Sequence, residues 1–145
     1  YLGIHPRFGL TQYLSSASIS IEQTVTHLSD VPGLDVICAG PVPPNPAELL
    51  VSDKVDELFR ELRTQYDSII VDTAPIGLVS DTFTLDRIAD AAIYVCRANY
   101  TSVKDLEEVN RIYDNNRLKK LSIVVNGTAS KKSYGYSKDK DRVKA

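Results

Sequence analysis

The 145-residue chain has no tryptophan and no methionine, and it has only two cysteines. Cys38 and Cys96 form no CxxC pair and have no histidine at a metal-binding spacing, which argues against a zinc site. Each lies in a short apolar run, so we expect two small buried thiols in a protein from a reducing compartment. Because the chain begins at Tyr1 and lacks methionine, we expect it to be part of a longer polypeptide.

Long apolar runs and an excess of one charge are also missing. No stretch approaches the roughly 20 apolar residues of a membrane span, and no signal peptide is visible. The 17 basic and 19 acidic residues give a net charge of −2, so nothing indicates a nucleic-acid partner. Hydrophobic residues make up 43% of the chain, which is enough for the core of one domain.

Short apolar runs alternate with helical patterns along the chain. The expected strands are residues 34–39, 68–71, 91–96 and 121–125. The expected helices are short pieces within 8–30, a stretch over 46–66 that begins at Asn45-Pro46 and has a second cap at Ser52, and residues 80–88 and 102–115. Continuous apolar strands are typical of a parallel sheet that is covered on both faces. The sequence therefore predicts an α/β fold with helices on both faces of a parallel sheet.

Ligands of an open parallel sheet bind beyond the carboxyl ends of its strands. The expected strands end at Ala39-Gly40, Asp72-Thr73, Arg97-Ala98 and Asn126-Gly127. Asp72 is the sharpest candidate, because a carboxylate directly after a buried strand can hold Mg²⁺ at the mouth of a phosphate site. The alternative is that Asp72 caps a turn before Pro75, and the residues alone leave both interpretations open.

Several catalytic motifs are missing. The chain has no GxxxxGK[ST] phosphate loop, and the nearest glycine pair, Gly3 and Gly9, is followed by no lysine. It also has no GxSxG turn of a serine hydrolase, and no partner can be assigned to His5 or His27, which we interpret as structural or surface residues. These 145 residues alone therefore do not complete a nucleoside triphosphate site.

Two runs carry a family resemblance. Residues 40–50, GPVPPNPAELL, followed by residues 66–75, YDSIIVDTAP, resemble the bacterial tyrosine kinases, the cytoplasmic kinase domains of polysaccharide co-polymerases. Further matches in the same order are Asp81, Ala89-Asp90, residues 95–101 and residues 124–126. The resemblance extends over nearly the whole chain up to about Asn126.

The resemblance implies a three-layer P-loop-type fold, of which residues 1–130 would be the C-terminal part. The family's phosphate loop and its Asp-x-Asp strand would precede Tyr1, so the N-terminal strands of the sheet would be missing here. Asp72 would belong to the Walker B element and hold Mg²⁺ beside ATP, and Thr73 and Pro75 would shape the floor of the pocket.

Two further strand ends acquire a role through the same resemblance. Asn126 is similar in place to an asparagine that contacts adenine in related ATPases. Arg97 would line the nucleotide or an interface, and a surface ion pair is the alternative for this residue.

The last residues differ in composition from the rest of the chain. Residues 131–145 contain six basic side chains and two aspartates, which predicts a flexible basic tail. By resemblance, Tyr134 and Tyr136 would be phosphoacceptors that a neighbouring subunit phosphorylates, with the added charge offset by nearby lysines. The alternative is that they are ordinary residues of a disordered end.

The resemblance as a whole implies an ATP- and Mg²⁺-dependent tyrosine autokinase that regulates exopolysaccharide or capsule polymerisation and export. Implied partners are further copies of the chain in a ring, a membrane-spanning co-polymerase region or activator, and a cognate phosphatase, at the cytoplasmic face of the bacterial inner membrane. The 145 residues alone are expected to be inactive. The alternatives are a related ATPase that positions cargo or partitions DNA, and a non-catalytic assembly module.

Overall fold

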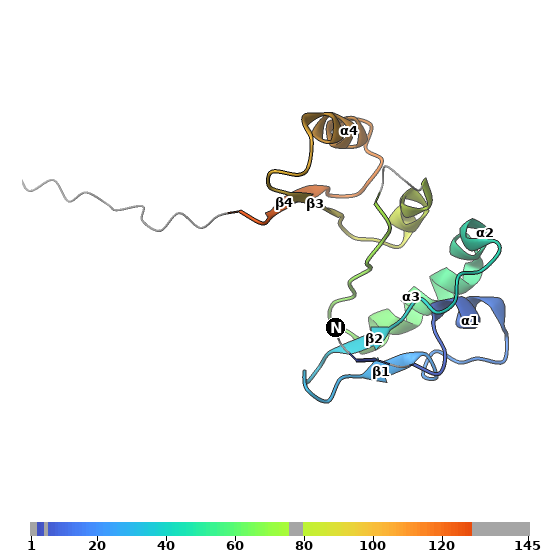
Figure 1. Ribbon diagram of the computed structural model, residues 1–145. Coiled ribbons are helices and arrows are strands. Elements are labelled where there is room, and N and C mark those ends of the chain that lie inside the picture. The colour runs from blue at the N-terminus through green and yellow to red at the C-terminus, as the bar shows by residue number, and fades with distance from the viewer. Residues whose placement is uncertain (1–2, 5, 76–79, 129–145) are drawn as a thin grey trace, which may run out of the picture.

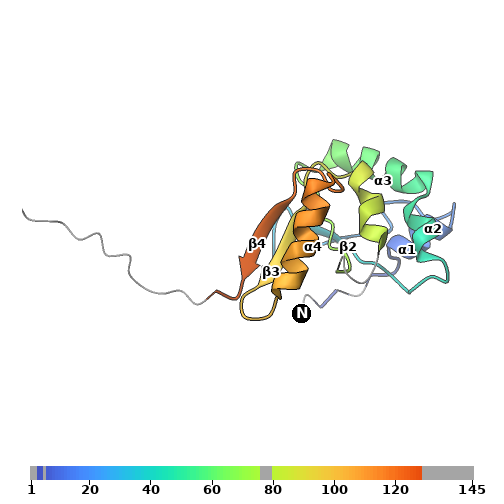
Figure 2. The same ribbon diagram turned by 90° about the horizontal axis from the view of Figure 1, so that it is seen from above.

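The computed structural model describes residues 3–4, 6–75 and 80–128 (Figure 1). Its elements, in chain order, are α1 (Leu10–Ser15), β1 (Val25–His27), β2 (Asp35–Ile37), α2 (Pro46–Leu50), α3 (Asp53–Gln65), the 3-10 helix η1 (Ser80–Arg87), β3 (Ile93–Arg97), α4 (Val103–Asp114) and β4 (Ser122–Asn126). Figures 1 and 2 show two groups of elements. The first contains α1–α3 with β1 and β2, and the second contains α4 with β3 and β4. Helix η1 packs against α2 of the first group.

The core of the first group lies along α3. Val55, Leu58 and Leu62 are buried on one face of this helix, at the spacing of an amphipathic α-helix. They pack in one cluster with Tyr13, Leu14, Ile21 and Ile88. The predicted helix over 46–66 is present as two helices that break before Ser52, as the second cap predicted.

The strand pair β1–β2 lies partly where the sequence predicted short helices. Short helical pieces were predicted within residues 8–30, but Val25–His27 is a strand that pairs antiparallel with Asp35–Ile37. The helical turn at Ile21 ends at Val25, and the β-branched residues that follow find a strand partner in β2. The sheets are therefore not all parallel.

Gly9 fixes the start of α1 against the end of β2. A Cβ atom at this position would lie 2.6 Å from the Gly40 nitrogen and 2.7 Å from the Cys38 oxygen, so only glycine fits. The close approach lets the Leu10 and Thr11 amides donate to the Cys38 and Ala39 oxygens at 2.8 and 2.9 Å. This contact holds residues 38–40, the predicted strand end, in place.

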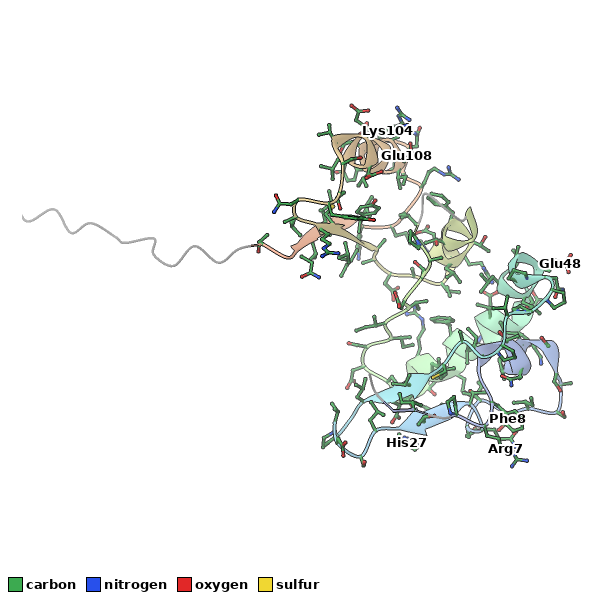
Figure 3. All side chains as sticks on the ribbon, viewed as in Figure 1. Arg7, Phe8, His27, Glu48, Lys104 and Glu108 are labelled. Atoms are coloured by element: carbon green, nitrogen blue, oxygen red, sulfur yellow. The ribbon has the colours of Figure 1, made fainter. Side chains whose placement is uncertain are left out.

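The second group contains the predicted parallel pair. Strands β3 and β4 are joined in register from Ile93 opposite Ser122 to Arg97 opposite Asn126, and α4 connects them. Helix α4 covers one face through its buried Val109 and Ile112 (Figure 1). Its polar side, with Lys104 and Glu108, points away from the sheet (Figure 3).

The opposite face of β3–β4 is open in the part of the chain that the structure describes. Ile93 and Val95 on this face are 66% and 63% exposed, and neighbouring Val124 is also exposed. The expectation of strands covered on both faces is therefore wrong for these residues. The α/β composition itself agrees with the prediction.

Residues 68–71 differ most from the prediction. They form neither a helix nor a strand ladder with any described residue, and Ile70 is 94% exposed. The predicted helix at 80–88 is a 3-10 helix. Cys96 is buried as expected, whereas Cys38 is half-buried, and both thiols are free. No helix among the described residues has the length and apolarity needed to cross a bilayer.

Candidate functional site

An apolar trough of about 720 Å³ lies beside α3. Helix α3 contributes Leu58 and Leu62 to its lining, and two extended segments, residues 34–39 and 68–74, contribute most of the rest. The lining is mainly aliphatic, with a few polar side chains from the two segments. Two of the predicted strand ends, at Ala39 and at Asp72-Thr73, belong to these segments and line the trough.

Asp72 and Thr73 line this trough, whereas Pro75 is exposed outside its lining. The Asp72 carboxylate is exposed and accepts no hydrogen bond from any described residue. The predicted alternative, a turn cap, is therefore not formed among these residues. The segment ends where the Thr82 hydroxyl donates to the Ala74 carbonyl at 3.4 Å.

The oxygen ligands at Asp72 suit Mg²⁺, which binds proteins through one or two carboxylates and keeps several waters or phosphate oxygens. Among the described residues, no group of three or more His, Cys, Asp or Glu side chains is placed to hold a metal ion. Asp72 therefore fits as one ligand of a magnesium–phosphate complex. The other ligands would have to come from the nucleotide, water or residues outside this set.

A second cluster forms where β3 and β4 end. Arg97 and Asn126 are register partners, and the Ala98 amide donates to the Asn126 carbonyl at 2.9 Å. The Asn126 side-chain oxygen accepts the Gly127 amide at 2.7 Å, which leaves its NH₂ group as a hydrogen-bond donor. The structure thus brings together two side chains that the sequence placed on separate strands.

Tyr100 and Thr101 complete this cluster and were missed by the sequence analysis. The Arg97 guanidinium lies 5.6 Å from the centre of the Tyr100 ring, a cation–π arrangement. The Arg97 amide donates to the Thr101 hydroxyl at 2.8 Å. The surface ion pair considered for Arg97 is not formed with any described residue. The available signal was an aromatic and a polar residue three and four positions after the end of β3.

The two clusters share no hydrogen bond or ion pair within the described residues. Asp72 and Thr73 lie in the trough, and Arg97 and Asn126 lie at the end of the β3–β4 pair. Tyr134, Tyr136 and the predicted tail lie outside the described residues, as does His5.

A hydrogen-bonded triad at the edge of the trough joins three elements. The Tyr66 hydroxyl donates to one oxygen of Asp35 at 2.6 Å, and His27 Nδ1 lies 2.6 Å from the other. The Tyr66 hydroxyl first, and His27 second, lower the pKa of Asp35, and the same carboxylate raises the pKa of Tyr66. His27 is an exposed residue of β1 (Figure 3), which agrees with its interpretation as a surface residue.

Comparison with known proteins extends this description. No protein-family model matches the chain. It is 38% identical over 135 residues to the tyrosine-protein kinase YwqD of Bacillus subtilis, covering 92% of the chain and 56% of YwqD. It is 30% identical over 129 residues to the tyrosine-protein kinase Etk of Escherichia coli K12, covering 89% of the chain and 18% of Etk.

Solved structures agree with these relatives. The VpsO kinase domain superimposes with a TM-score of 0.73 at 35% identity, covering 83% of this chain and 59% of that domain. The kinase domain of Escherichia coli Etk gives a TM-score of 0.73 at 30% identity, covering 93% of this chain and 54% of that domain. The chain is a homologue of the bacterial tyrosine kinases.

The resemblance found in the sequence is therefore confirmed. The chain spans about half the length of YwqD and of the solved kinase domains, and it matches less than a fifth of full-length Etk. Within that half, its α/β elements superimpose on bacterial tyrosine kinase domains. The described strand ends thus belong to one part of a larger domain type.

Proposed function

We propose that these residues form the C-terminal part of the catalytic domain of an ATP-dependent bacterial tyrosine kinase with P-loop-type layering. The observation that carries the proposal is the match to YwqD, Etk and the solved kinase domains over nearly all of the chain. Asp72, at the end of an extended apolar segment in the trough, supports it chemically.

Phosphoryl transfer requires positioning and charge stabilisation more than covalent work by the protein. Asp72 would hold Mg²⁺, which offsets the negative charge of the ATP phosphates, and Thr73 and Pro75 would shape the floor of the pocket. The NH₂ group of Asn126 would donate to an acceptor nitrogen of adenine, while its side-chain oxygen accepts the Gly127 amide. Arg97 would line the same nucleotide.

The chain contains no phosphate loop, so the donors that hold the β- and γ-phosphates would come from outside these residues. Such donors supply several charge-assisted hydrogen bonds. We therefore expect the 145-residue chain alone to show no measurable ATP hydrolysis under conditions in which an intact relative turns over.

The tail and the partners belong to the same proposal by resemblance. Tyr134 and Tyr136 would be the acceptors, phosphorylated in trans by a further copy of the chain in a ring. The kinase would work with a membrane-spanning co-polymerase region at the cytoplasmic face of the inner membrane, in exopolysaccharide or capsule export, and a cognate phosphatase would remove the phosphates.

An Asp72→Asn substitution in the complete kinase that carries these residues tests the proposal. Asp67→Asn is the matched control, because Asp67 is an exposed carboxylate at the start of the same segment. With ATP and Mg²⁺, we expect D72N to reduce tyrosine phosphorylation at least about tenfold and D67N to leave it unchanged. Equal phosphorylation in D72N and the unsubstituted kinase would contradict the assignment of Asp72.

A further inference from the structure

Tyr100 has the most exposed tyrosine side chain that the structure describes, at 79%. It lies in the loop between β3 and α4 (Figure 2), and its hydroxyl forms no hydrogen bond with any described residue. Three other tyrosines differ from it, because Tyr13 is buried, Tyr94 is half-buried on β3 and the Tyr66 hydroxyl donates to Asp35. The Tyr100 hydroxyl is therefore accessible to a reaction partner from outside the chain.

The loop that carries Tyr100 has a defined conformation at the end of β3. The amides of Tyr100 and Thr101 donate to the Arg97 carbonyl at 3.1 and 2.9 Å, and the Arg97 amide donates to the Thr101 hydroxyl at 2.8 Å. Asn99 has a left-handed backbone conformation, with φ of 60°, which asparagine tolerates better than most residues. The turn thus presents Tyr100 outside any helix or strand, beside the side chain of Arg97.

Arg97 carries the charge that a phosphate on Tyr100 would need. Its guanidinium lies 5.6 Å from the centre of the Tyr100 ring, and it forms an ion pair with no described residue. A phosphotyrosine has a charge of about −1.5 to −2 and three strong acceptor oxygens, and a guanidinium binds phosphate through two parallel hydrogen bonds. Arg97 can therefore pair with such a phosphate without leaving a described carboxylate.

Tyr113 is the other strongly exposed tyrosine among the described residues, at 63%, but its surroundings have the opposite charge. It lies in the last turn of α4 beside Asp114, and no described arginine or lysine lies over its ring. A phosphate on Tyr113 would meet a neighbouring carboxylate and the negative end of the helix dipole. Exposure makes both tyrosines accessible, whereas the local charge favours a phosphate on Tyr100 alone.

We propose that Tyr100 is a phosphoacceptor of the kinase, in addition to the tail tyrosines, and that Arg97 holds the added phosphate. The proposal rests on the proposed function, since ATP bound by the kinase is the phosphoryl donor. The Tyr100 oxygen forms a bond to the γ-phosphorus, and the bond from this phosphorus to the β–γ bridging oxygen breaks. ADP leaves, and the phenolic proton passes to water.

Peptide mass spectrometry of the complete kinase that carries these residues tests the proposal. Tryptic peptides 98–104, 112–117 and 133–138 separate Tyr100 and Tyr113 from the two tail tyrosines. After incubation with ATP and Mg²⁺, we expect phosphate in peptide 98–104 at an occupancy at least about tenfold higher than in peptide 112–117. Tyr100→Phe should remove the phosphate from 98–104, which also contains a threonine and a serine.

The outcomes separate this proposal from the proposed function. Phosphate on 133–138 without phosphate on 98–104 would overturn the assignment of Tyr100 and leave the kinase function standing. No phosphate on any of the three peptides would overturn both. Equal occupancy of 98–104 and 112–117 would also overturn the assignment, because exposure alone would then select the acceptor.

Phosphorus NMR tests the role of Arg97 in the phosphorylated kinase with Tyr134→Phe and Tyr136→Phe. We expect the second pKa of the Tyr100 phosphate to lie below the value of about 6 of a free phosphotyrosine, and to rise to about 6 when urea unfolds the protein.

Two substitutions locate this effect. Arg97→Gln should remove the difference between the folded and unfolded protein. Arg117→Gln, the matched control, should retain it, because the Arg117 guanidinium lies 4.0 Å from the centre of the Phe83 ring, in a contact of the same kind without a tyrosine. Equal pKa values in the folded and unfolded protein, or a lowered pKa that survives R97Q, would overturn the assignment of Arg97.

Discussion

The two groups of elements treat similar apolar residues in opposite ways. Val55 of α3 is 2% exposed, whereas Val95 of β3 is 63% exposed. Helix α3 needs cover on one stripe only, and α1, Ile21 and Ile88 from the same chain supply it. A parallel strand needs neighbours at both edges and cover on both faces. The comparison teaches that a helix can satisfy its apolar surface with local segments, whereas these strands cannot.

The candidate residues follow segments that lack partners or cover among the described residues. Asp72 follows residues 68–71, which pair with no described strand, and Arg97 and Asn126 end two strands whose second face no described residue covers. The buried cluster along α3 is thus formed by the described residues, whereas these residues do not complete a metal site. In the proposed function, the chain folds around α3 and supplies part of a nucleotide site.

The largest effect on stability is expected from a substitution in the buried core of the first group. Leu58→Ala, at a buried position of α3, removes packing from both the core and the trough. We expect it to lower the free energy of unfolding of the 145-residue chain by about 2–5 kcal/mol. Val95→Ala on the open face should change it by less than about 0.5 kcal/mol. Urea denaturation measures both, and equal losses would contradict the contrast between the two groups.

The next effect concerns the contact between η1 and the first group. The Arg87 guanidinium donates to both oxygens of Asp56 at 3.2 Å and to the Leu50 carbonyl at 2.9 Å. We expect Arg87→Ala to cost about 1–2 kcal/mol in the same measurement, because the side chain is partly exposed and its ion pair is screened. Arg111→Ala is the control, since the Arg111 pair with Glu108 is an exposed contact within one helix and its loss should cost less than about 0.5 kcal/mol.

A smaller effect concerns the start of α4. Ser102 accepts the Asp105 amide at 3.2 Å, and the Asp105 carboxylate accepts the Ser102 amide at 2.9 Å, which is a capping box. We expect Ser102→Ala to destabilise the second group by about 1 kcal/mol, seen as faster exchange of the α4 amides. Exchange in α3 is the internal control, because the cap makes no contact with that helix. Equal acceleration in both helices would indicate one cooperative unit instead of two.

The sequence predicted the features that depend on neighbouring residues, namely the helix starts and the positions of most strands. Pro46 and Ser52 placed the helix starts, and the apolar runs placed β2, β3 and β4 within two residues of their observed bounds. The helix predicted around Val25 was wrong because a distant partner, Ile37, decided the strand. The sequence could not predict that residues 68–71 pair with no described strand, because helical and strand patterns indicate which surfaces need cover but not whether the same chain supplies it. The same limit applies to the candidate site. Asp72 as a magnesium ligand stays a prediction, and no group of three or more His, Cys, Asp or Glu side chains among the described residues is placed to hold a metal ion.

The smallest expected effect sharpens the description of the trough edge. The pKa of Asp35 is lowered mainly by the Tyr66 hydroxyl, so the folded state favours the charged carboxylate. Its contribution to stability is therefore present above the pKa of the unfolded chain and is lost as the pH falls through the lowered value. Tyr66→Phe should raise the pKa of Asp35 towards its ordinary value and reduce this acid-dependent loss. An NMR titration of the Asp35 carboxyl measures the shift, with Tyr100→Phe as the exposed control that should leave it unchanged. An unaltered Asp35 titration in Y66F would show that His27, and not Tyr66, holds the carboxylate in its charged form.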